Sequence, residues 1–127
     1  MSSLKTIVVC LVLWPLSLQA GQRDNSDIAL QFSGCLGRYA AQVAHDHLMR
    51  RDAQDDERRL RTFAALLDAV PATPLPPATI MAHRIDAKMR FADLLRIAEF
   101  HTDPQRAARA ARLVRRHLRA CETLVLG

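Results

Sequence analysis

Apolar residues recur at three- and four-residue spacing in four separate segments of this chain, and no segment alternates apolar and polar residues over a useful length. That spacing is typical of helices that bury one face, whereas half-buried strands alternate with a period of two. Prolines or short polar stretches separate the segments, and the chain contains no internal repeat. The sequence therefore predicts an all-α protein.

The predicted helices cover residues 27–50, 53–70, 78–100 and 104–124. Helices of this length joined by short links are typical of an up-down four-helix bundle, in which the first and last helices are antiparallel neighbours. We interpret the proline-rich stretch 71–77 as an ordinary connection between helices. The third helix carries two adjacent apolar stripes, and we expect the bundle to cover both: Met81, Ile85, Ala92 and Leu95 on one, and Ala87, Phe91, Leu94 and Ala98 on the other.

Residues 1–20 have the three-part pattern of a secretory signal peptide. Lys5 provides a positive charge, residues 7–13 are an unbroken apolar run, and Ala20 is a small residue at the expected cleavage edge. The apolar stretch of about 12 residues is short of the ~20 that span a bilayer, so an uncleaved anchor is the weaker interpretation. We predict cleavage after Ala20, export to the periplasm or the exterior, and a single helical bundle domain over residues 21–127.

Cleavage would leave two of the three cysteines, Cys35 and Cys121. An even pair in an exported chain predicts one disulfide, and antiparallel packing of the first and last helices would bring the two positions to similar heights. Closing such a long loop would contribute about 4–5 kcal/mol by the chain-entropy estimate. We therefore expect a disulfide-linked bundle.

One alternative for these cysteines is a metal site. If Cys35 and Cys121 were reduced, they could form a thiolate–imidazole site for zinc or copper with His117, which precedes Cys121 by about one helical turn. The competing interpretation is a disulfide beside a buried His117 that is hydrogen-bonded to Tyr39. Export favours the disulfide.

A haem site is the weaker cofactor alternative. His117 loosely matches the helix-four ligand of bundle-type b cytochromes, but residues 21–48 contain no methionine to supply the other ligand. We therefore predict no cofactor.

The positive charge of the chain is almost all arginine, at 16 of 18 basic residues, and six of the arginines lie on the polar side of the fourth helix. Such a face can simply be solvated, or it can bind an acidic protein partner, a nucleic acid or, weakly, an anionic membrane surface. Export and an aromatic content of 5% argue against nucleic acid. The acidic stretch 52–57 is one possible partner, within or between chains. The candidate interaction surface comprises Arg109, Arg112, Arg116 and Arg119, together with His45 and His47.

Enzymatic chemistry has little support in this sequence. It contains no glycine-rich phosphate loop, nucleophile elbow or zincin motif. His45 and His47 are two residues apart on a helix, so their side chains point in different directions and cannot share a metal. The acidic residues at 52–57 are explained by the helix dipole. We predict a non-enzymatic exported accessory protein that acts by protein interaction.

Three stretches and a late cysteine resemble a group of small exported bacterial helical proteins of no assigned function. The stretches are residues 35–38 (CLGR), 45–49 (HDHLM) and 83–88 (HRIDAK), and the cysteine is Cys121. The resemblance implies a helical fold with a disulfide, and it implies no catalytic residue.

Overall fold

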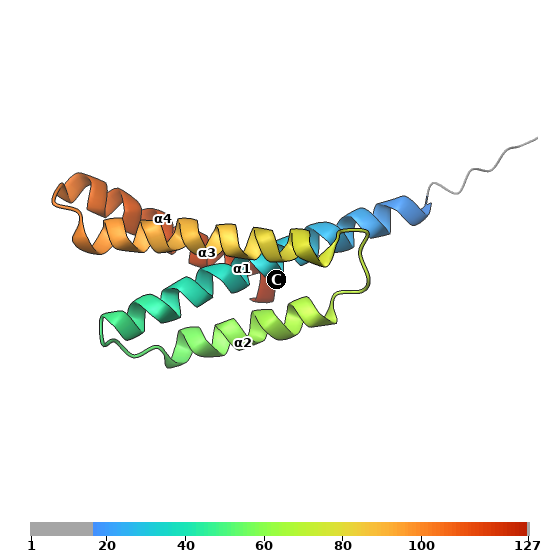
Figure 1. Cartoon of the computed structure of the whole chain (residues 1–127), viewed down its shortest axis with the longest axis horizontal. Coiled ribbons are helices and arrows are strands. Elements are labelled where there is room, and N and C mark those ends of the chain that lie inside the picture. Colours follow the sequence, from blue (N-terminus) through green and yellow to red (C-terminus); the bar gives the residue numbers. More distant parts are fainter. Residues whose placement is uncertain (1–16, 127) are drawn as a thin grey trace, which may run out of the picture.

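The computed structural model describes residues 17–126, and it confirms the predicted four-helix bundle. α1 and α3 run in one direction while α2 and α4 run in the other (Figure 1). No strand occurs within the described residues. The helices are α1 (Ser17–Leu48), α2 (Gln54–Ala69), α3 (Pro77–Phe100) and α4 (Pro104–Leu126).

Every predicted helix end lies within two residues of the observed one, except the start of the first helix. We expected a start near Asp27 because the polar residues just before it suit an N-cap, but α1 already begins at Ser17. Those polar residues lower helix propensity only modestly, and no proline stops the helix there. The predicted cleavage point after Ala20 therefore falls in the first turns of α1. Most of the predicted leader, residues 1–16, lies outside the described residues.

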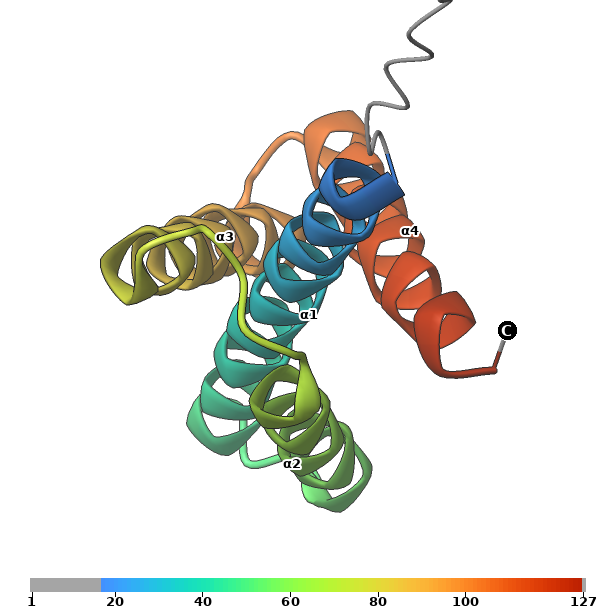
Figure 2. The ribbon, with the colours of Figure 1, turned by 90° about the vertical axis from the view of Figure 1, so that its right-hand side faces the viewer.

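The bundle is built around α1 rather than as a square of four equal helices. Figure 2 shows α2, α3 and α4 arranged about α1. Cα atoms of α2 come within 8 Å of α1 but not of α3 or α4, and the closest pair in the bundle is α1 with α3. In a square up-down bundle, these two parallel helices would lie on a diagonal. The central position of α1 explains why its residues dominate the core.

A glycine allows the close approach of α1 and α3. A Cβ atom built on Gly37 would run into the backbone carbonyl of Arg84 and lie 3.1 Å from the amide nitrogen of Lys88. Only a residue without a side chain fits between the two backbones here. One turn earlier, the buried Ser33 Oγ donates a hydrogen bond to the carbonyl oxygen of Ile80 at 2.8 Å, which ties the same two helices together.

Two clusters of buried side chains make up the core. The first joins α1, α2 and α4, and in it Tyr39 stacks on Phe63 with ring centroids 5.7 Å apart. The second joins α1 and α3 through Ala41, Phe91 and Leu95. Leu118 of α4 packs against both clusters. The side chains of α1 thus connect the two halves of the core.

Only one of the two apolar stripes predicted for α3 is covered throughout. The stripe of Ala87, Phe91, Leu94 and Ala98 is buried or half-buried along its length. On the other stripe Leu95 is buried, but Met81 and Ile85 are 51% and 53% exposed and Ala92 is also exposed. The expectation that the bundle covers both sides is wrong for this second stripe. The physical reason is the position of α2, which packs on α1 and therefore leaves the outer side of α3 without a neighbour among the four described helices.

Candidate functional site

Cys35 and Cys121 form the predicted disulfide. Their Cα atoms are 5.7 Å apart, and both side chains are essentially inaccessible to solvent. The bond links α1 to α4, the contacting pair of helices with the smallest backbone contact. It therefore fixes α4 against the centre of the bundle where packing alone holds it least.

His117 lies on the inner side of α4, where it meets the edge of the Phe91 ring at a centroid distance of 6.3 Å. Burial lowers the pKa of His117, and the positive charges of Arg38 and Arg116 lower it further. The expected hydrogen bond to Tyr39 is wrong: the Tyr39 hydroxyl instead accepts one from Arg59 Nη1 at 3.2 Å. Arg59 can contact this hydroxyl because α2 packs against Tyr39 in the first core cluster.

The metal-site alternative would require the Cys35–Cys121 bond to be reduced, because disulfide sulfurs are not thiolate ligands. Among the residues that the structure describes, no three histidine, cysteine, aspartate or glutamate side chains are grouped as metal ligands would be.

None of the helices described is long and apolar enough to cross a membrane.

All six arginines of α4 are exposed, as predicted, although Arg106 lies one turn before the buried Ala110 and so on the same side of the helix. Ala110 and Cys121 face the core, and every arginine of this helix is exposed. At 100° per residue, Arg109, Arg112, Arg116 and Arg119 fall within one arc of about 80°, and they extend over about 15 Å of the helix. We call these four residues the arginine stripe.

The arginine stripe has no counter-charge within the described part of the chain. Five arginines on the rest of the bundle form salt bridges with carboxylates, whereas none of the α4 arginines does. The only carboxylate in α4, Glu122, pairs with Arg59 of α2. The possible pairing with the acidic stretch 52–57 of the same chain is absent from the described salt bridges: Asp55 pairs with Arg58, and Glu57 with His47.

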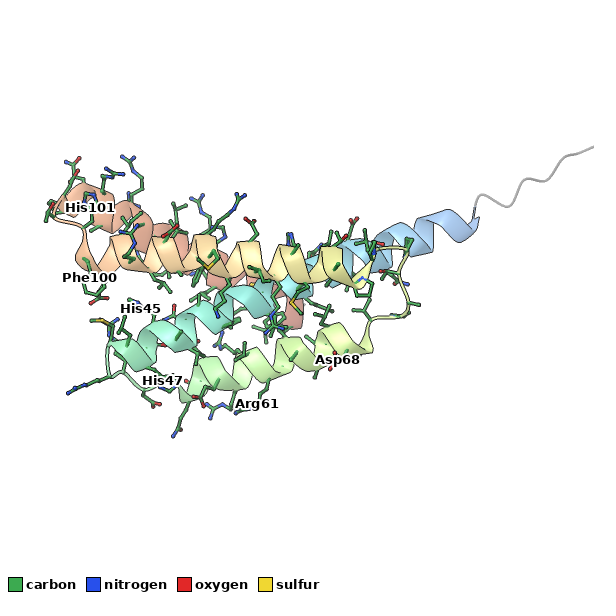
Figure 3. The ribbon with its side chains drawn as sticks, in the orientation of Figure 1. His45, His47, Arg61, Asp68, Phe100 and His101 are labelled. Carbon is green, nitrogen blue, oxygen red and sulfur yellow. A yellow bond between two sulfur atoms is a disulfide. The ribbon has the colours of Figure 1, made fainter. Side chains whose placement is uncertain are left out.

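The two predicted histidines lie near the C-terminal end of α1, where His45 faces Phe100 and His47 lies toward α2 (Figure 3). His45 Nε2 is 3.5 Å from Glu99 Oε2, and His47 Nε2 is 3.1 Å from Glu57 Oε1. Carboxylates of the chain itself therefore engage both rings. They differ in this respect from the arginine stripe, which has no such partners.

A pair of carboxyl groups was missed by the sequence reasoning. Asp46 of α1 is buried and accepts a hydrogen bond from Gln42 Nε2 at 3.0 Å. Burial, together with the neighbouring Asp46 carboxyl group, raises the pKa of Asp56 in α2 to about 6. Asp56 is therefore about half protonated near pH 6. The available signal was that Asp46 continues the core spacing of Cys35, Tyr39 and Gln42.

No family model, curated protein or solved structure matches this chain. The resemblance to small exported bacterial helical proteins stays a prediction. What the molecule can do must therefore be inferred from its own surfaces.

Proposed function

We propose that this chain is an exported, non-enzymatic accessory protein whose arginine stripe binds an acidic protein partner. The observation that carries the proposal is the contrast between α4 and the other helices. Five arginines elsewhere in the described bundle form salt bridges with carboxylates, whereas none of the six on α4 does. A positive surface without internal partners is available to an external anion.

The chemistry of the stripe favours carboxylates. A guanidinium group presents a planar set of donors that can bind a carboxylate through two parallel hydrogen bonds. Four such groups on one side of a rigid helix match a row of acidic side chains on a partner. The attraction would accelerate association and weaken with added salt, because ions screen charges over about 8–10 Å at physiological ionic strength.

The proposal of export rests on the leader pattern in residues 1–20 and on the cysteines. Disulfides form and persist in oxidising compartments such as the bacterial periplasm. The Cys35–Cys121 bond is consistent with that environment. A weak association with an anionic membrane surface is the alternative use of the same charges.

Replacing Arg109, Arg112 and Arg116 together by glutamine tests the proposed function. We expect partner binding to weaken about tenfold or more, since three contacts worth roughly 0.5–1 kcal/mol each are lost. The matched control is the triple glutamine variant of Arg58, Arg90 and Arg96, which removes the same charge from arginines that already pair.

The measurement is quantitative recovery of proteins from the exported fraction of the host on each tagged variant, with circular dichroism to verify that helicity is unchanged. Equal recovery on the two triple variants would contradict the proposal. If no protein were recovered, but the chain bound anionic lipid vesicles and lost this binding in the variant without the three arginines, the proposed acidic protein partner would be wrong. The arginine stripe would then bind a membrane surface.

A further inference from the structure

A pocket of about 500 Å³ lies beside the disulfide, between α1, α3 and α4. Its polar lining consists of Asp27, Gln31 and Arg38 of α1 and His83 of α3. This volume lies within the range of about 300–1,000 Å³ that is typical of small-molecule sites. The pocket is separate from the arginine stripe, so an inference about it does not depend on the proposed function.

Arg38 is a half-buried cation without a counter-charge among the described residues. Its Nη1 atom donates to the sulfurs of Cys121 and Cys35, at 3.6 and 3.8 Å, and disulfide sulfur is a weak acceptor. No carboxylate of the described chain forms a salt bridge with it, although Asp27 lines the same pocket. Burial lowers the pKa of Arg38, yet a guanidinium stays charged at physiological pH. A strong acceptor is thus missing beside this group.

A second nitrogen group approaches the same point. A Cβ atom built on Gly34 would lie 3.2 Å from His83 Nε2 and 3.8 Å from Arg38 Nη1. Gly34, Arg38 and His83 all line the pocket, so both nitrogen groups border the same cavity beside Gly34. A carboxylate placed in this space could accept two hydrogen bonds from Arg38 and one from His83, which is the geometry that guanidinium groups favour.

The rest of the lining determines which carboxylate fits. Leu30, Ala120 and Leu124 offer an apolar wall for the body of a ligand. The Asp27 carboxylate repels anions, and it disfavours phosphates and dicarboxylates, which carry more negative charge, more strongly than a monocarboxylate that Arg38 and His83 can neutralise. We propose that this pocket binds a small organic monocarboxylate with an apolar body, anchored by Arg38 and His83 above Gly34.

Hexanoate is a suitable probe, with hexanamide as its uncharged counterpart. Titration into the full, disulfide-bonded chain, followed by amide chemical shifts in two-dimensional NMR spectra, should show saturable changes in residues 27–38 and around His83. We expect hexanamide to bind about tenfold more weakly or worse, because it cannot form the charged pair with Arg38.

Three variants locate the site. Arg38→Gln should weaken hexanoate binding about tenfold, whereas Arg61→Gln, which removes an exposed charge from α2, should leave it unchanged. Gly34→Ala should also weaken binding several-fold, because its Cβ occupies the space between the two nitrogen groups; it keeps the proposal testable if Arg38→Gln fails to fold. The proposal would be overturned if hexanoate gave no saturable shifts or if hexanamide bound equally well. It would also be overturned if a folded Arg38→Gln or Gly34→Ala variant bound hexanoate as tightly as the Arg61→Gln control.

Discussion

Gly37→Ala is expected to destabilise the protein by about 1–3 kcal/mol, although the same substitution ordinarily stabilises a helix by about 1 kcal/mol. The sign reverses because the new methyl group would meet the backbone carbonyl of Arg84 rather than solvent or a movable side chain. α1 and α3 would have to move apart, and the core cluster of Phe91 and Leu95 would loosen with them. Urea denaturation of the variant and the unchanged protein measures the difference.

Gly34→Ala is the matched control for Gly37→Ala because it lies on the same helix, one turn away. Its Cβ would meet the side chain of His83, at 3.2 Å, and no backbone atom of a neighbouring helix. A histidine side chain can shift, so we expect a much smaller loss of stability than at Gly37. If Gly37→Ala proved as stable as the unchanged protein, the close crossing of α1 and α3 would be contradicted.

Reduction of the Cys35–Cys121 bond should have the second large effect, a loss of about 2–5 kcal/mol in the free energy of unfolding. The two cysteines are separated by 86 positions, so the bond constrains most of the unfolded chain. It also secures α4, whose backbone contact with α1 is small. We therefore expect reduction to increase amide hydrogen exchange in α4 more than in the other helices.

Reducing the unchanged protein is preferable to substituting the cysteines, because it leaves no cavity at these buried positions. Denaturation and hydrogen exchange would be compared before and after reduction, and again after reoxidation. Equal stability of the oxidised and reduced forms would show that the packing of α4 on α3 holds α4 in place without the disulfide. Uniform loss of protection across all helices would contradict the specific role assigned to the bond in holding α4.

The helices could be predicted from the sequence because their apolar spacing and proline boundaries are local signals. The arrangement of the helices could not, since it depends on which pair of backbones approaches most closely. The sequence does not say that α3, rather than α4, packs closely against Gly37. The exposure of Met81 and Ile85 follows from that same choice of neighbours.

The arginine stripe was predictable in position, because helical periodicity places its residues opposite the apolar face of α4. Its lack of internal partners was not, since salt bridges depend on which helices are neighbours. The same holds for the Asp46 and Asp56 pair and for the pocket at Arg38, each of which combines side chains from different helices. The residue pattern marks Asp46 as a core position, but it does not show which side chains of other helices these groups meet.

The most direct test of the exported, disulfide-linked bundle is the intact mass of the protein, combined with thiol labelling. The protein is taken from the exported fraction of its own host. We expect a mass that lacks residues 1–20, no labelled thiol in the untreated protein, and labelling of Cys35 and Cys121 only after reduction. Together these results would establish the exported, disulfide-linked bundle on which the proposed function depends. A chain that retains its leader, carries free thiols or shows the mass of a bound metal would contradict the exported, disulfide-linked bundle. Free thiols together with a bound metal would make a metal site of Cys35, Cys121 and His117 the better explanation.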